Sequence, residues 1–120
     1  MKEQKNKLVE IQKEICKKFG REFESAPFEL KVGIALNVRN GIEPINALRH
    51  IPEGDTSGWY IWAGEYRDDS DFFKPLHISH LEEWCPLIIP YLGLSAGSRV
   101  LIAENGNYID VWEDKSLLEI

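Results

Sequence analysis

One small set of residues in the sequence could bind a metal ion. His77 and His80 stand three positions apart, Cys85 follows, and His50 lies further back in the chain. Protein zinc sites use His nitrogen and Cys sulfur, and structural sites need four such ligands at recognised spacings. This set has no fourth ligand at such a spacing. We therefore expect histidines that hydrogen-bond near a helix end, with no metal and no cofactor.

Three short motifs resemble catalytic or calcium-binding sequences. Residues 93–97 read Gly-Leu-Ser-Ala-Gly, the pattern of a hydrolase nucleophile elbow, but a helix is expected before them and a strand after, which reverses the order of that motif. Residues 55–58 read Asp-Thr-Ser-Gly, but an aspartic protease requires Asp-Thr-Gly or Asp-Ser-Gly and a second copy of it. Asp69 and Asp71 begin like a calcium loop, but Lys74 occupies the glycine position. We predict a glycine-rich turn and two solvated loops.

A histidine could also serve as a general base. His50 or His77 beside Asp110 or Glu65 would provide the base and a carboxylate that orients it. No serine or cysteine nucleophile in a credible context accompanies either histidine. The sequence therefore predicts a protein that is not an enzyme.

Length and composition limit the architecture and the partner. The chain has 120 residues, 43% of them hydrophobic, which predicts a single domain over residues 1–120. Twenty acidic residues against 14 basic ones give a net charge of −6, which argues against binding to nucleic acid or anionic membranes and favours a basic protein partner. Cys16 and Cys85 are expected to be reduced thiols. With no long apolar segment, the chain is expected to be soluble and cytoplasmic.

An amphipathic helix is predicted over residues 3–19, ending at Gly20. Its apolar residues recur at spacings of three and four, which places them on one face. They are Leu8, Ile11, Ile15 and Phe19. We expect this face to pack on the protein's own sheet.

Alternation of apolar residues predicts strands after Pro27. The pattern favours a strand over 32–38, while residues 26–31 could instead form a helical turn capped by Ser25. Asn40-Gly41 is a strong hairpin signal and predicts a returning strand over 45–50. A loop at 51–58 then leads into a strand at 59–62, and the acidic segment 65–71 and the sequence FFKPLH follow.

The second half predicts a helix and a hairpin. Ser79 and Glu82 match a capping box for a helix over about 80–92, and Pro86 and Pro90 predict a break near residue 85. Strands at 99–103 and 108–112 flank an Asn105-Gly106 turn. The expected fold is α+β: an antiparallel sheet of about five strands, with the N-terminal helix and the Pro-interrupted helix packed on one face.

Aromatic residues lie on both faces of two predicted strands. Trp59 and Ile61 share one face of their strand, while Tyr60 and Trp62 share the other, so the strand is either central and buried or part of a binding surface. We favour central burial, with Trp59 in the core. In the last strand, Ile109 and Val111 are expected to face the core. Tyr108, Asp110 and Trp112 are then expected near solvent.

The strings TSGWYIWAGE, DDSDFFKPLH, PYLGL and YIDVWED resemble those of a family of bacterial polymorphic-toxin immunity proteins. The sequence is similar to immunity protein family thirty-three and its relatives, whose mark is a Ser-Gly-Trp strand followed by Gly-Glu. Here the mark is Ser57-Gly58-Trp59 and Gly64-Glu65, and Thr56 stands where Asp or Asn is frequent. The resemblance covers about residues 30–114.

This resemblance implies a toxin partner, held inactive by a protein bound over its active or substrate-binding surface, and no cofactor. Combining it with the acidic loop and the aromatic face of the last strand, we expect a binding surface for a basic toxin. Its residues would be Glu65, Asp68, Asp69, Asp71, Tyr108, Asp110, Trp112 and Glu113. The alternative is a small-ligand or protein-binding module, which a deep apolar pocket lined by Trp62, Tyr60 and His50 would favour.

Overall fold

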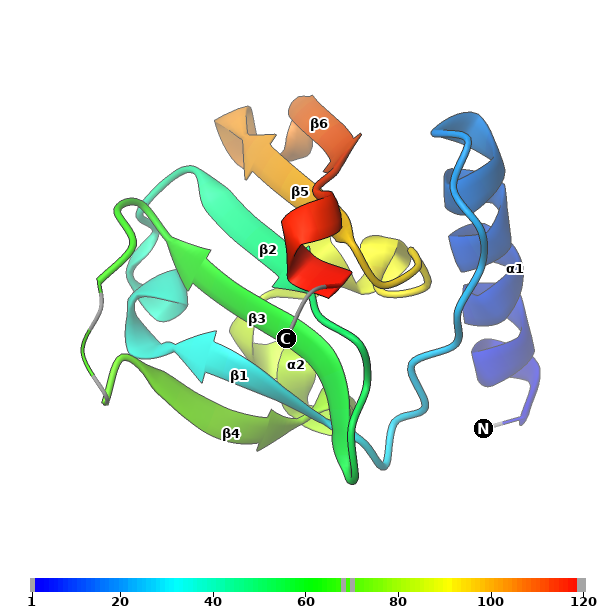
Figure 1. Ribbon diagram of the computed structural model, residues 1–120, viewed down its shortest axis with the longest axis horizontal. Coiled ribbons are helices and arrows are strands. Elements are labelled where there is room, and N and C mark those ends of the chain that lie inside the picture. The colour runs from blue at the N-terminus through cyan, green and yellow to red at the C-terminus, as the bar shows by residue number, and fades with distance from the viewer. Residues whose placement is uncertain (1, 68, 70, 119–120) are drawn as a thin grey trace.

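The computed structural model describes residues 2–67, 69 and 71–118, and a single six-stranded sheet organises them (Figure 1). The strands lie in the order β4-β1-β3-β2-β5-β6. Their bounds are β1 Lys31–Ala35, β2 Ile45–Arg49, β3 Thr56–Ala63, β4 Phe73–His77, β5 Ser98–Ala103 and β6 Tyr108–Glu113. β1 and β3 run parallel and the other pairs antiparallel. The α+β class is confirmed, but the sheet is mixed and has six strands, not an antiparallel five.

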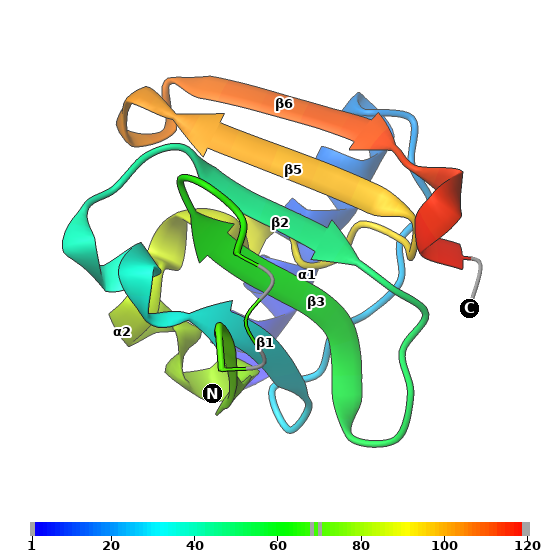
Figure 2. The ribbon, with the colours of Figure 1, turned by 60° about the vertical axis from the view of Figure 1, so that its left-hand side comes forward.

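The two α-helices cover one face of this sheet, and the turn η5 (Lys115–Leu118) lies on the other. In Figure 2, α1 and α2 lie behind the strands, as the sequence predicted for its two helical regions. The helical elements are α1 Lys2–Lys18, α2 Leu81–Trp84, and the 3-10 turns η1 Leu36–Asn40, η2 Ile78–His80, η3 Pro86–Tyr91, η4 Glu104–Gly106 and η5 Lys115–Leu118. Among the described residues, no helix is both long and apolar enough to span a membrane.

Helix α1 packs chiefly against η3, and its buried face is the predicted one in part: Ile15 and Phe19 pack against the main core as expected, but Ile11 does not. Gln12 and Cys16 are 5% and 2% exposed, whereas Ile11 is 47% exposed. The Gln12 side-chain amide donates to the Ile89 carbonyl oxygen (2.9 Å), and the Cys16 thiol donates to that of Gly93 (3.2 Å). These carbonyls lie within and just beyond η3, and each also accepts a backbone N–H, from Leu92 and from Glu24. Polar pairing to the η3 region thus accompanies the burial of this face of α1.

The main core lies between the sheet and the helices. Trp59, at 1% exposed, belongs to it as predicted, and its indole Nε1 donates to the Leu92 carbonyl oxygen (2.9 Å). Arg49 is fully buried beside it, with its guanidinium carbon 5.6 Å from the Trp59 ring centre. The guanidinium donates to the backbone carbonyls of Glu24, Ser25, Ser57, Leu92 and Leu94. One arginine thus joins three separate segments of the chain.

The predicted hairpin at Asn40-Gly41 is wrong. The strand predicted over 32–38 ends at Ala35, and the chain turns through η1 to Gly41, which has a φ of 71°. β3 then lies between β1 and β2, so these two strands do not pair. The Asn-Gly pair does provide a left-handed turn, but this turn does not join sheet neighbours. In the ambiguous segment 26–31, Leu30 N–H bonds the Pro27 carbonyl oxygen at 3.0 Å, which marks a turn.

Three further boundaries differ from the prediction or refine it. β3 begins at Thr56, inside the predicted loop, and the FFKPLH segment forms the edge strand β4. The helix expected over 80–92 breaks at Cys85 into α2 and η3, as its prolines predicted. Ser79 does not cap it: the residue before α2 is His80, which makes no side-chain cap bond. The hairpin of β5 and β6 is confirmed, with six residue pairs in unbroken register.

Candidate protein-binding surface

The sheet face opposite the helices, here called the open face, carries most of the predicted binding residues. Cross-strand neighbours in an antiparallel sheet project to the same side, so the register assigns each side chain to a face. The open-face pairs are Leu48 with Tyr60, Asn46 with Trp62, Leu101 with Asp110, and Arg99 with Trp112. Figure 2 views this face, with the segment that follows β3 in front of the sheet.

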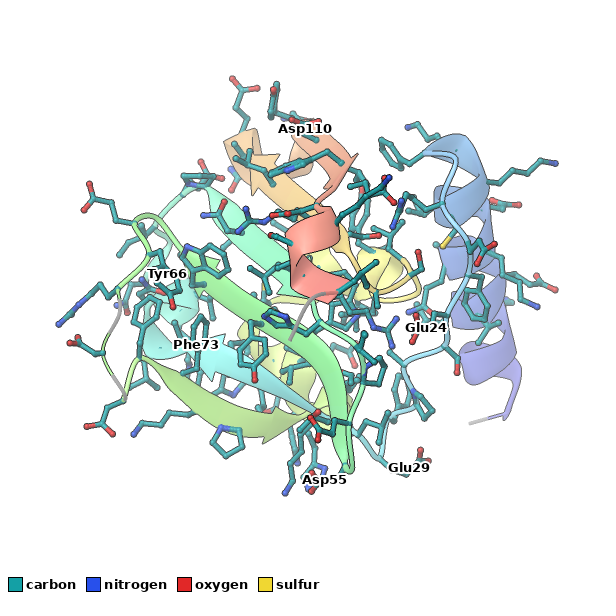
Figure 3. The ribbon with its side chains drawn as sticks, in the orientation of Figure 1. Glu24, Glu29, Asp55, Tyr66, Phe73 and Asp110 are labelled. Atoms are coloured by element: carbon teal, nitrogen blue, oxygen red, sulfur yellow. The ribbon has the colours of Figure 1, made fainter. Side chains whose placement is uncertain are left out.

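An aromatic cluster fills the β3 and β4 side of the open face. Its members are Tyr60, Trp62, Tyr66, Phe72 and Phe73. The ring centres lie 4.9 Å apart for Phe72 and Phe73 and 5.5 Å apart for Trp62 and Tyr66, mostly edge to face. Trp62 is 6% exposed and Tyr66 is 56% exposed (Figure 3). Trp62 is therefore buried within the cluster, while Tyr66 presents its ring to solvent.

The turn η5 closes the other end of this cluster. Leu117 is 7% exposed and packs with Ala35, Leu48 and Trp62. The His50 ring Nδ1 lies 3.2 Å from the Leu117 carbonyl oxygen, and the His50 ring meets Tyr60 edge to face at 5.5 Å. Leu117 and neighbouring rings thus occupy the place where a pocket lined by Trp62, Tyr60 and His50 was considered.

Asp114 directly precedes η5 and bonds to its first residues. Its carboxylate accepts a hydrogen bond from the Ser116 backbone N–H (3.1 Å) and forms an ion pair with Arg99 (3.3 Å). The hydrogen bonds from Ser116, with a smaller contribution from the Arg99 charge, hold the pKa of Asp114 below its ordinary value.

The last strand presents an aromatic and acidic row, as predicted. Tyr108 and Trp112 are 51% and 38% exposed, and Asp110 lies exposed between them. Ile109 and Val111 pack against the main core on the opposite side of the strand. The Arg99 guanidinium carbon lies 6.0 Å from the Trp112 ring centre, within the range of a cation–π contact.

Glu113, also predicted to bind, points to the other side of the sheet. It lies in register with Ser98, and its carboxylate pairs with Arg21 at 3.2 Å. Arg21 also donates to the hydroxyls of Ser98 and Ser95. Glu113 is thus an anchor for the segment after α1 and not part of the open face.

The acidic loop, residues 65–71, lies beyond the aromatic cluster. Glu65, Asp69 and Asp71 are exposed, and Asp68 falls outside the described residues. Asp69 pairs with Arg67 at 2.6 Å, and Asp71 lies 3.8 Å from the Lys74 ammonium. Asp69 and Asp71 also line a cleft of about 520 Å³ against η1, together with Leu36, Asn37, Asn40, Arg67 and Phe72.

The structure does not bring the two predicted groups together. The acidic loop joins β3 to the edge strand β4, while β6 forms the opposite edge of the sheet. In Figure 3, Asp110 lies far from Tyr66 and Phe73. The open face therefore presents two patches: a β6 patch of Tyr108, Asp110 and Trp112, and a loop patch of Tyr66 and the acidic loop.

The residues considered for metal or catalytic chemistry remain apart. Among the residues that the structure describes, no three His, Cys, Asp or Glu side chains are placed to hold a metal ion. His77 contacts the Glu29 carbonyl oxygen, and Ser95 sits in the turn between η3 and β5. Burial raises the pKa of the free thiols of Cys16 and Cys85, which favours their unreactive protonated form.

Three aromatic residues in and next to the loop patch were not predicted from the sequence. Tyr66, Phe72 and Phe73 belong to the open face, but they lie in or next to an irregular segment where no periodicity assigns a face. Their one signal was composition: three aromatic residues flank a run of acids. An aromatic residue in a polar loop has no local partner, so it packs onto the nearest apolar surface.

Comparison with protein families matches residues 11–114 to the Imm33-like domain. The match covers most of the chain and begins within α1, earlier than residue 30, where the motif resemblance began. Neither the curated proteins nor the solved structures gave a match.

Proposed function

The chain belongs to the Imm33-like family, and we propose that it is an immunity protein that binds a cognate bacterial toxin and covers the toxin's active or substrate-binding surface. The proposal includes a cytoplasmic location, a mechanism of binding without catalysis, and no cofactor. Family membership supports the immunity role. The rest depends on the surface described above.

The observation that carries the binding surface is the exposure of aromatic rings beside acids on the open face. Tyr66, Tyr108 and Trp112 are each more than a third exposed. Each of them lies within two positions of an exposed carboxylate in the sequence. Large aromatic side chains contribute disproportionately to protein interfaces, because they bury a large area at low entropic cost. A solvent-facing row of them on a stable sheet is a suitable anchor for a protein partner.

Charge supports a basic toxin. A net charge of −6 and the carboxylates of the two patches create a field that attracts a cationic partner and raises its association rate. Toxins that act on nucleic acid need basic surfaces to hold phosphates. A protein that covers such a surface must match it with acids. The partner is therefore a basic toxin, and neither nucleic acid nor membrane is a partner.

The alternative, a small-ligand module, has less support. Leu117 and the aromatic cluster fill the site that such a module would need. The cleft beside η1 is lined mainly by polar and charged side chains, whereas small-molecule pockets are mostly apolar.

The direct test is co-expression with the cognate toxin, to be sought among the products of the genes next to the one that encodes this chain. We expect the chain to restore growth to cells that make the toxin and to co-purify with an inactive toxin variant in a fixed ratio. A variant with Asp69→Lys, Asp71→Lys and Trp112→Ala should still fold, but it should protect the cells less well than the wild type. Growth arrest that persists with the wild-type chain, without co-purification, would refute the immunity function.

A further inference from the structure

The two edges of the sheet are not equally protected against a further strand. At the β4 edge, Pro75 lacks a backbone N–H in the middle of the strand, and Lys74 adds a charge. Both features are common protections of an edge strand. β6 contains neither proline nor lysine, and it keeps six residue pairs with β5 without a bulge. Of the described chain, no segment pairs with its outer side.

In β6, the backbone N–H and C=O groups of every second residue point outward, away from β5. Asp114 N–H donates to the Gly97 carbonyl oxygen at 2.7 Å, which sets the phase of the β5–β6 ladder. Every second residue from there, namely Trp112, Asp110 and Tyr108, then turns its N–H and C=O toward β5. Ile109, Val111 and Glu113 turn theirs away from the sheet. The outer edge of β6 thus presents three consecutive unpaired donor and acceptor positions.

The side chains next to these positions select the strand that would pair there. Tyr108, Asp110 and Trp112 would lie beside the added strand on the open face. Trp112 and Tyr108 can pack against it, and the exposed Asp110 carboxylate favours a positively charged residue opposite. A second copy of this chain brings another net charge of −6, and repulsion opposes such pairing.

We propose that the toxin docks by adding an extended, basic segment to the outer edge of β6, so that backbone pairing continues the sheet into the toxin. This inference rests on the proposed immunity function and specifies how the β6 patch is used. The added strand bonds Ile109, Val111 and Glu113 through the backbone, and its lysine or arginine side chains meet Asp110 on the open face. Backbone pairing supplies affinity, and the flanking side chains select the segment.

Proline substitution tests the edge without changing the open-face side chains. Val111→Pro removes an outward N–H and places a ring where the added strand would lie, but it leaves the bonds to β5 intact. Ile109→Pro does the same at a second position. Val111→Ala is the matched control for the lost side chain, and Asp110→Pro, which removes an inward N–H, is the control for a damaged hairpin. The probe is an inactive form of the toxin against which the wild-type chain protects, and with which it co-purifies, in the experiment above.

We expect Val111→Pro and Ile109→Pro to keep the circular dichroism spectrum of the wild type and to weaken toxin binding by at least about tenfold. Val111→Ala should bind within about threefold of the wild type. Hydrogen exchange on the wild-type chain gives an independent readout: the amides of Ile109, Val111 and Glu113 should exchange fast in the free chain and slowly in the complex.

Each contrary outcome identifies what failed. If the wild type binds the toxin, and folded Val111→Pro and Ile109→Pro bind equally well, edge pairing is wrong while the immunity function stands. Should proline unfold both variants, unchanged exchange of the three amides on toxin binding would overturn the proposal. A wild-type chain that is dimeric alone, and monomeric with Val111→Pro, would assign the edge to a second copy. No binding by the wild type refutes both proposals.

Discussion

Two tryptophans show how position decides what a residue does. Trp59 lies under the sheet, 1% exposed, with its Nε1 bonded to Leu92, while Trp112 lies on the open face, 38% exposed. Trp59→Ala should lower the free energy of unfolding by about 3–5 kcal/mol, because it leaves a cavity and removes the indole hydrogen bond to Leu92. Trp112→Ala should change it by less than about 1 kcal/mol. Urea titration of both variants checks the contrast. An unchanged unfolding midpoint for Trp59→Ala would contradict a core role for Trp59.

Gly58 has a backbone conformation that favours glycine. The sequence was compatible with this conformation but did not establish it. Its φ is +88°, and a Cβ there would lie 2.0 Å from the His50 carbonyl oxygen. Gly58→Ala should therefore destabilise the fold by more than about 2 kcal/mol. Gly54, with a φ of +59° and open space around it, is the control, and Gly54→Ala should cost about 1 kcal/mol. Equal thermal shifts in the two variants would contradict the close approach.

At the scale of elements, η5 works as a cover for the aromatic cluster. Leu117 is 7% exposed and packs with Trp62 and Leu48, while its neighbour Leu118 is 40% exposed. Leu117→Ala should lower the free energy of unfolding by about 2–3 kcal/mol, and Leu118→Ala by less than about 1 kcal/mol. Chemical denaturation measures both. A larger loss for Leu118→Ala would mean that η5 rests on the sheet through its other side.

Periodicity in the sequence located most strands but not their neighbours. Asn40-Gly41 has the local chemistry of a hairpin, yet β3 pairs with both β1 and β2, because burial of Trp59 and Ile61 requires a central position. Pairing of distant segments is a tertiary choice that a two-residue turn does not determine. β4 was missed as a strand because Pro75 breaks its pattern, and proline is tolerated there only because the strand is an edge.

A polar partner explains the error in α1, and the strand order explains the split of the predicted site. The pattern of apolar residues favoured Ile11 over Gln12, since no sequence rule shows that the Gln12 amide reaches the Ile89 carbonyl oxygen. Both halves of the binding surface were predicted as exposed, and the β6 face is confirmed as exposed. Their separation follows from the strand order, which places β4 and β6 at opposite edges.

At the scale of the whole molecule, the acidic loop should govern how fast the toxin arrives. Asp69→Lys with Asp71→Lys should reduce the association rate constant by about tenfold at low salt, with a smaller effect on dissociation. The control pair is Glu10→Lys with Glu14→Lys on α1, which changes the net charge equally on another side of the molecule. Surface plasmon resonance at two salt concentrations measures this effect, which should shrink as salt screens it. Equal rate changes in the two pairs would assign steering to net charge and not to the loop.

The central claim is that the chain neutralises a toxin through its open face. The most direct measurement is the dissociation constant for an inactive variant of the cognate toxin, by calorimetry, for the wild type and for Tyr108→Ala with Trp112→Ala. Loss of two anchors should cost about 2 kcal/mol or more, which is roughly a 30-fold weaker complex. Ile11→Ala, which truncates an exposed apolar residue on α1, should bind like the wild type. Unchanged affinity in the double variant, with weakened binding by Ile11→Ala, would contradict the account.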